Sequence, residues 1–187
     1  MVLIDVAPSI EFSPNRWFEL VSEVNLARTR QSDRVTSWEV APRIGFRVHF
    51  LNNLRKMLPS RHRLGRVGIA NFSRFEWRNL WYSDDTDPSH QTRFRNRVEL
   101  KVGLNHADMS LDETVYLTAD YEIFVPLSDD VPERFASKAR LRAGLGYRRD
   151  KKWRFEMLYI RDATRQTEGG SFETSANIVD FRMKVFF

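Results

Sequence analysis

Four histidines, His49, His62, His90 and His106, are the residues best suited to acid–base or metal chemistry, and their spacing supports neither. No two of them have the helical spacing of zinc ligands, and no His-x-Glu or His-Glu-x-x-His motif occurs. The chain has no cysteine, which excludes a thiolate nucleophile, disulfides and Cys-based metal sites. The nucleophile-elbow, P-loop and dinucleotide-binding motifs are also missing. We therefore expect no enzyme activity, no cofactor and no bound metal.

Two weaker candidates for chemistry remain. Ser73 and Ser110 are candidate nucleophiles of a lipid-modifying membrane enzyme, but only because of their residue type. Asp84, Asp85 and Asp87 could chelate calcium in a loop. A run of carboxylates in a turn is more often a solvated surface, so neither candidate changes the expectation above.

The elements that position the remaining polar residues follow a period of two. Along Val115–Val125 the odd positions are apolar, whereas the even positions include Asp120 and Glu122. Successive side chains of a strand point to opposite faces, so this segment has one apolar and one charged face. Nearly the whole chain repeats the pattern. It predicts an all-β single domain over residues 1–187, built as an up-and-down antiparallel β-barrel of about 8–10 strands.

Nine segments have the strand pattern and are separated by turn residues. They are Val2–Phe12, Arg16–Arg28, Arg34–Phe50, Arg66–Tyr82, Thr92–His106, Thr114–Leu127, Arg134–Arg148, Lys152–Thr164 and Glu173–Phe187. Asn52–Arg63 is either a short amphipathic helix or a basic loop. Pro42 lies within a predicted strand, where it predicts a bulge or a bend.

Alternation alone does not tell which face is inside. A soluble lipocalin-like barrel has an apolar interior that binds an apolar small molecule, and its charges face water. A membrane barrel has its apolar face toward lipid and its polar face toward the lumen. Three features favour the membrane barrel, and in it the charged residues form an ionic network in the lumen. This network is predicted to contain Arg74, Glu76, Arg78, Arg93, Arg95, Arg97, Glu99, Asp120, Glu122, Arg140, Arg142, Glu156 and Arg182.

The first feature is the last strand, which alternates apolar with charged residues and ends on an aromatic one. Phe181, Met183, Val185 and Phe187 resemble the C-terminal signal by which bacterial outer-membrane barrels are recognised for insertion. The second feature is a set of aromatic residues near the ends of the apolar stripes, as in an interfacial girdle. These residues are Trp38, Trp77, Trp81, Tyr147, Trp153, Tyr159 and Phe187.

The third feature is that charges on the polar face can pair, because a narrow lumen would make unpaired charges costly. The turn near Met109 predicts that Arg97 lies opposite Glu122 and Glu99 opposite Asp120. Similar arithmetic puts Glu156 between Arg142 and Arg182.

Composition is compatible with this architecture. The mean hydropathy is −0.50, which a membrane barrel also shows because its polar face dilutes its apolar face. No apolar stretch is long enough for a transmembrane helix. The net charge is +5 with a pI near 9.7. The arginines alternate with apolar residues inside strands instead of clustering on a helix or tail, so we expect no nucleic-acid partner.

Short motifs of the predicted strands carry a family resemblance. They are Trp17-Phe18-Glu19-Leu20, Arg74-Phe75-Glu76-Trp77-Arg78, Arg93-Phe94-Arg95-Asn96-Arg97, Tyr121-Glu122-Ile123-Phe124 and Leu145-Gly146-Tyr147-Arg148. Their order resembles a bacterial family, domain of unknown function 2490: an R-x-E-Q-R-like strand, then R-x-R, then Y-x-E-x-F, then R-x-x-x-G-x-G-Y. Arg140, Gly144, Gly146 and Tyr147 match the last motif. Trp77 departs from the pattern, because the family often has Gln there. The resemblance runs from Arg66 to Phe187.

The resemblance implies a β-barrel of the outer membrane of Gram-negative bacteria, with no established activity and no catalytic residues. The expected partners are the lipid bilayer and the outer-membrane insertion machinery, and the expected role is structural or narrow transport. Bacterial barrels have even strand numbers. Nine segments, with no basic n-region before Asp5, therefore lead us to expect a missing upstream strand and a ten-stranded parent. Eight strands remain an alternative if Val2–Phe12 lies outside the sheet.

Overall fold

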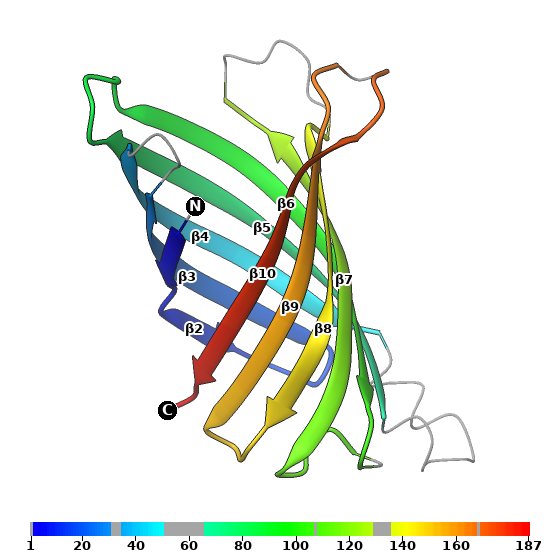
Figure 1. The fold of residues 1–187 in the computed structure, drawn as a ribbon. Helices are drawn as coiled ribbons and strands as arrows, with labels where there is room; N and C mark the ends of the chain where they lie inside the picture. The colour runs from blue at the N-terminus through cyan, green and yellow to red at the C-terminus, as the bar shows by residue number, and fades with distance from the viewer. Residues whose placement is uncertain (1, 31–34, 51–65, 107, 129–135, 168) are drawn as a thin grey trace.

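The alternation of apolar and charged residues builds ten β-strands, which pair side by side in one antiparallel sheet (Figure 1). The computed structural model describes residues 2–30, 35–50, 66–106, 108–128, 136–167 and 169–187. The strands are β1 (Val2–Val6), β2 (Ser9–Phe12), β3 (Phe18–Arg30), β4 (Thr36–His49), β5 (Val67–Tyr82), β6 (Ser89–Gly103), β7 (Thr114–Pro126), β8 (Lys138–Arg148), β9 (Trp153–Thr164) and β10 (Glu173–Val185). These described ranges contain no helix, and hence none long and apolar enough to span a membrane.

The first predicted segment forms one edge row of the sheet, but it is split into two strands. β1 and β2 share one register on β3, with Val6 opposite Leu26 and Ser9 opposite Glu23. Between the two strands, the carbonyl of Pro8 accepts a hydrogen bond from the N–H of Val24 at 3.1 Å. Proline has no N–H to donate in return, so the ladder is interrupted there. The other eight predicted segments correspond to β3–β10 with small differences at their ends.

The sheet curls into a half-barrel, which confirms the all-β antiparallel class but not a closed barrel. No pairing between described residues joins β10 to β1 or β2. The order of the strands sets the relative direction of the two edges. Neighbouring rows alternate in direction from β1 and β2 through β10, so the two edge rows of this nine-row sheet run parallel to each other. An antiparallel closure between them is therefore impossible.

The sequence predicts a bulge or a bend at Pro42, and the structure has no bulge there. Pro42 lies opposite Val24 on β3 in an unbroken register. The pairs with β5 lapse after Val40 and resume at Arg43 in the same register. The proline therefore removes a ladder hydrogen bond without inserting an extra residue. A register shift occurs instead in β10, between Thr174 and Ala176.

Side-chain oxygens hold three short turns at one end of the sheet. Asn15 accepts hydrogen bonds from the N–H groups of Trp17 and Phe18, at 2.9 and 3.0 Å. Asp108 and Asp150 accept equivalent bonds from residues that follow them in their turns. Asn and Asp favour turns because they bond to the backbone in this way. The predicted segment Asn52–Arg63 lies outside the described residues.

Candidate functional site: an ionic network on the concave face

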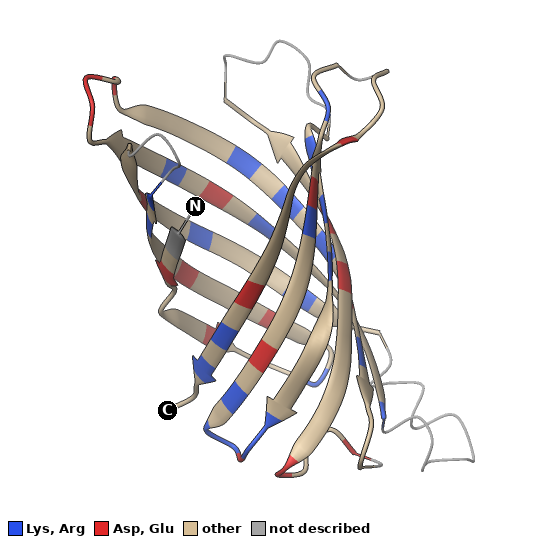
Figure 2. Ribbon diagram, viewed as in Figure 1, with Lys and Arg blue, Asp and Glu red and all other residues tan. Residues whose placement is uncertain are grey.

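Charged residues form rows across neighbouring strands (Figure 2). Lys101 on β6 reaches Glu156 on β9 with an Nζ–Oε1 distance of 3.9 Å, although β7 and β8 lie between them. Neighbouring strands are about 4.8 Å apart, so such a contact requires the two side chains to lie inside the curve of the sheet. Glu76 and Glu122 on the same face are 0% and 1% exposed. The charged face is therefore the concave one.

The convex face is apolar and exposed. Strands from both halves of the sheet contribute to it. Its exposed members include Trp38, Ile44, Phe46, Phe75, Trp77, Trp81, Val98, Leu100, Leu117, Tyr121, Leu141, Leu145, Phe155, Met157, Tyr159, Val179, Phe181 and Met183.

Glu76 on β5 is the most densely paired carboxylate of the concave face. Its Oε1 lies 3.0 Å from Arg43 Nε, 3.1 Å from Arg74 Nε and 2.6 Å from Arg95 Nη1. Its Oε2 lies 2.5 Å from Arg93 Nε. Four guanidinium groups from β4, β5 and β6 thus surround one buried carboxylate, which compensates the cost of burying it.

Glu122 on β7 continues this cluster toward β8. Arg95 donates two hydrogen bonds to it, Nε to Oε1 at 3.0 Å and Nη2 to Oε2 at 2.7 Å, in the bidentate geometry that suits a guanidinium and a carboxylate. Arg142 donates to Glu122 Oε2 at 2.9 Å and to Asp120 Oδ1 at 2.7 Å. Arg95 therefore joins the Glu76 and Glu122 groups into one central network that extends from β4 to β8.

The other predicted members of the network pair outside this centre. Arg78 Nη2 lies 2.6 Å from Glu39 Oε2, and Arg140 Nε lies 2.5 Å from Asp162 Oδ1. Two further pairs lie within single strands: Arg97 with Glu99, and Arg182 with Asp180. The structure therefore brings the predicted residues together as several ion-pair groups instead of one continuous ladder.

Two of the predicted cross-strand positions are confirmed and one is partly wrong. Arg97 lies opposite Glu122, and Glu99 opposite Asp120. Glu156 lies opposite Arg182, as predicted, but its partner on β8 is Gly146 and not Arg142. The turn between β8 and β9 sets this register. The carboxylate of Glu156 binds Lys184, with an Nζ–Oε2 distance of 2.8 Å.

Buried aromatic rings of the concave face were not predicted as part of the network. Arg95 lies over the ring of Phe124 at 4.4 Å from its centroid, and Arg47 lies over Phe72 at 4.7 Å. Cations are attracted to the faces of aromatic rings. The two rings therefore attract the guanidinium groups and also separate them from one another. The sequence does contain a sign that Phe72 and Phe124 lie on the concave face. Both fall at even positions, which also carry the charges of β5 and β7. Arg43, Glu23 and other β3–β4 partners were also outside the predicted set.

The glycines of the G-x-G-Y motif have a packing role on the concave face. A Cβ atom at Gly146 would overlap the ring of Tyr116, and one at Gly144 would overlap the backbone of Met157 and Leu158. The absence of a side chain at Gly146 lets Tyr116 lie across β8 and donate a hydrogen bond to Glu156 Oε1 at 2.8 Å. The motif thus positions an ionic partner and carries no reactive group itself.

The predicted C-terminal signal lies on β10 and just beyond it. Phe181 and Met183 are exposed on the convex face, and Phe181 is 75% exposed. β10 ends at Val185, and Phe187 is also exposed. Asp180, Arg182 and Lys184 alternate with these residues, as the sequence predicts.

The candidate catalytic and metal-binding residues have other partners. Ser73 lies on the convex face, where its Oγ contacts Asn96 Nδ2 at 2.8 Å. His90 Nδ1 lies 2.7 Å from Asn79 Oδ1. Ser110 is exposed in a turn. Within the described ranges, no three residues among His, Cys, Asp and Glu are grouped to hold a metal ion.

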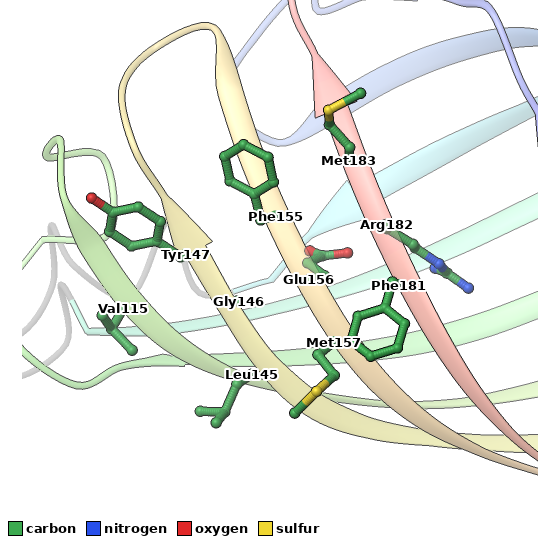
Figure 3. A pocket seen from close by; sticks show the side chains of 10 residues that line it. All are labelled: Val115, Leu145, Gly146, Tyr147, Phe155, Glu156, Met157, Phe181, Arg182 and Met183. Atoms are coloured by element: carbon green, nitrogen blue, oxygen red, sulfur yellow. The ribbon is translucent and has the colours of Figure 1, made fainter.

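A pocket of about 420 Å³ lies on the convex face between β7 and β10 (Figure 3). Its outward-facing lining consists of apolar and aromatic side chains, among them Leu145, Tyr147, Met157 and Phe181. Glu156 and Arg182 also border it, although both side chains form ion pairs on the concave face. The pocket therefore offers apolar contact and holds no serine or histidine.

A family model described as "Protein of unknown function (DUF2490)" matches residues 52–173. The chain belongs to this family. The match begins earlier than the resemblance in the sequence, which starts at Arg66, and it ends at the start of β10. The matched residues include the part of the central network on β5–β8. They also include the glycines of the G-x-G-Y motif. Neither the curated proteins nor the solved structures contain a match to the chain.

Proposed function

We propose that this protein is a small β-barrel of the outer membrane of Gram-negative bacteria. Its convex apolar face contacts lipid, and its salt-bridged concave face fills the lumen. The role that fits such a lumen is structural or narrow transport without enzyme activity. The observation that carries the proposal is the inversion of the two faces, since the ionic residues are buried and the apolar residues are exposed.

The convex face supports a lipid environment, because an apolar surface of this extent is unfavourable in water. It includes exposed tryptophans near strand ends, among them Trp38 and Trp81. Tryptophan is enriched at both membrane interfaces. The pocket between β7 and β10 would accommodate part of an acyl chain against Met157 and Phe181.

Several polar residues on the convex face form hydrogen bonds with one another, which lipid would require. Asn71 and Asn96 exchange hydrogen bonds of 3.1 and 3.0 Å, and Asn96 also donates to Ser73. Tyr159 donates to Asn177 Oδ1 at 2.8 Å. Arg161, near the loop end of β9, donates to Thr174 Oγ1.

The concave face favours a filled lumen over a wide pore. Small barrels usually have interiors filled by side chains. In the central network, Arg95 and Arg142 are each held by two carboxylates, and Phe124 packs beneath the guanidinium group of Arg95. Such fixed pairs limit passage to small solutes at most.

A bilayer would also require the two edges of the half-barrel to be satisfied, because unpaired backbone groups are costly in lipid. Direct pairing of β10 with β1 and β2 would give a nine-stranded barrel with one parallel seam. One further strand between the edges would give an even, fully antiparallel barrel. The C-terminal signal on β10 fits recognition by the insertion machinery in either case.

A soluble lipocalin-like barrel is the alternative, and it requires an apolar interior. Ion pairs in the concave face and exposed apolar residues on the convex face favour the membrane barrel instead. The two differ in their need for detergent. The chain, unfolded in urea, is diluted into micelles or into plain buffer, and gel migration is compared before and after boiling.

Refolding that requires micelles, with a band that shifts on boiling, is the expected result. A β-rich folded state in plain buffer, with no band shift in micelles, would contradict the proposal. The half-barrel would then have to close or associate around its apolar face in water.

A further inference from the structure

Basic side chains at one end of the concave face outnumber the carboxylates beside them. Lys101, Arg148, Arg154 and Lys184 lie there, and we call them the Arg148–Arg154 cluster. Lys184 and Lys101 share Glu156, at 2.8 and 3.9 Å. Glu156 is the only described carboxylate that forms ion pairs with these four cations, and its Oε1 also accepts the hydroxyl hydrogen bond of Tyr116. Glu99 acts on Lys101 and Lys184 electrostatically but forms no ion pair with them.

The two arginines of the cluster face each other. Arg148 on β8 lies directly opposite Arg154 on β9. Like charges at directly opposite positions are destabilising. The Nε atom of each is buried and has no hydrogen-bond partner. Arg154 lies over the ring of Phe186 at 4.4 Å, which covers one face of the guanidinium but supplies no negative charge.

Other arginines of the concave face have a carboxylate partner, which Arg148 and Arg154 lack. Arg43, Arg74 and Arg97 also have buried Nε atoms without a hydrogen bond, but each forms an ion pair with a glutamate. Among the ion pairs of the described residues, none includes Arg148 or Arg154. The difference marks one place where the concave face is short of negative charge.

Among the described carboxylates, only Glu156 forms an ion pair with a member of the cluster. Glu11 on β2 acts on Arg154 electrostatically but forms no ion pair with it. The two arginines therefore have no ion-pair partner among the described residues.

We propose that the Arg148–Arg154 cluster is an anion-binding site for a phosphate group. Two guanidinium groups on adjacent strands can each donate a pair of N–H groups to phosphate oxygens, the geometry in which arginine binds phosphate best. Lys101 and Lys184 add positive charge, and the Tyr116 hydroxyl lies beside them. The phosphate is either a free ion or the headgroup of a phospholipid. The site is on the concave face and does not depend on what covers the convex face.

The test uses the full chain refolded in zwitterionic micelles, with folding verified by gel migration before any ligand is added. Urea unfolding is measured with inorganic phosphate and with sodium chloride at equal ionic strength. A second series adds short-chain phosphatidylglycerol or short-chain phosphatidylcholine. The variants are the double change Arg148→Gln with Arg154→Gln, the single change Arg148→Gln, and Arg149→Gln as the control. Arg149 is the next residue along the chain and is exposed in the turn.

Phosphate or phosphatidylglycerol should stabilise the wild type and the Arg149→Gln control beyond the effect of chloride or phosphatidylcholine. Each Gln in the cluster should weaken this binding about tenfold. Without ligand, the double variant should be at least as stable as the wild type, because the repulsion between two arginines is removed. An effect of phosphate identifies a free anion as sufficient, whereas an effect of phosphatidylglycerol alone identifies the lipid headgroup.

Equal responses to phosphate and chloride, together with no response to phosphatidylglycerol, would overturn the proposal. So would a double variant that binds as the wild type does. A marked loss of stability of the single and double variants without ligand would assign both arginines a structural role instead.

Discussion

The two faces of strand β8 differ as the surface and the core of a soluble protein do, but in the opposite order. Leu141 is 51% exposed on the convex face, whereas its neighbour Arg142 is 3% exposed and is held by Asp120 and Glu122. Both residues belong to one alternating strand, so the backbone treats them alike. The difference teaches that the pattern sets which residues share a face, and that curvature decides which face is buried.

The largest expected effect comes from breaking the concave face at its most buried pair. Glu122→Gln leaves Arg95 and Arg142 with less negative charge in a buried site. We expect a loss of about 3–5 kcal/mol in the free energy of unfolding, measured with urea in micelles. Glu113→Gln, in an exposed turn, is the control and should change stability little. A loss from Glu122→Gln as small as that of the control would mean that water compensates the network.

The next effect tests the convex face with two leucines of equal exposure. Leu141 lies mid-strand and is 51% exposed, and Leu111 lies in a turn and is 49% exposed. In a bilayer, Leu141→Arg should cost about 2–4 kcal/mol at mid-depth, and Leu111→Arg should cost little. The yield of folded protein in lipid vesicles measures both. Two harmless variants would show that the convex face lies in water.

A smaller effect tests the packing of the Tyr116 ring against Gly146 of the G-x-G-Y motif. Gly146→Ala places a methyl group where the Tyr116 ring lies, and we expect a loss of about 1–3 kcal/mol. Gly169→Ala is the matched control, because no atom lies within 4 Å of its added Cβ. Combining Gly146→Ala with Tyr116→Leu should cost less than the sum of the single changes. Additive losses would show that the ring is not what Gly146 accommodates.

The smallest effect concerns a turn outside the strands. Backbone N–H groups of Lys152 and Trp153 donate to the carboxylate of Asp150, and these bonds hold the pKa of Asp150 below its ordinary value of 3.8. A lowered pKa contributes stability above the unfolded pKa, and this contribution is lost as the pH falls through the folded pKa. Asp150→Ala should therefore lower stability slightly at neutral pH and change nothing in strong acid. A difference between the two proteins that persists in strong acid would rule out the carboxylate as its cause.

Much of the fold could be predicted from the sequence, because its strands alternate strictly. The segments that became β3–β10 and the pairing of Arg97 with Glu122 across β6 and β7 follow from parity and from the turn near Met109. The split at Pro8 could have been inferred from its missing N–H. Whether the sheet closes into a barrel could not be predicted from the sequence. An odd number of rows leaves the two edges parallel, so they cannot pair as the other strands do.

The candidate site could be predicted as a set of residues but not as a set of pairs. Parity places Arg95 and Glu122 on one face, yet curvature decides that Arg95 contacts two glutamates on different strands. Phe124 has the same parity, but it carries no charge and so lay outside the predicted ionic network. The opposed Arg148 and Arg154 could not be predicted, because they depend on the same β8–β9 register that was wrong for Glu156.

The most direct test of the account measures whether lipid chains touch the convex face. Trp77 is exposed on β5 and serves as the sole fluorophore once the other tryptophans are changed to Phe. The protein is reconstituted into phosphatidylcholine vesicles with or without bromine on the acyl chains, and its fluorescence is compared. Strong quenching by brominated lipid and weak quenching by aqueous acrylamide are the expected results. Equal fluorescence in the two lipids, with strong quenching by acrylamide, would contradict the assignment of the convex face to the membrane.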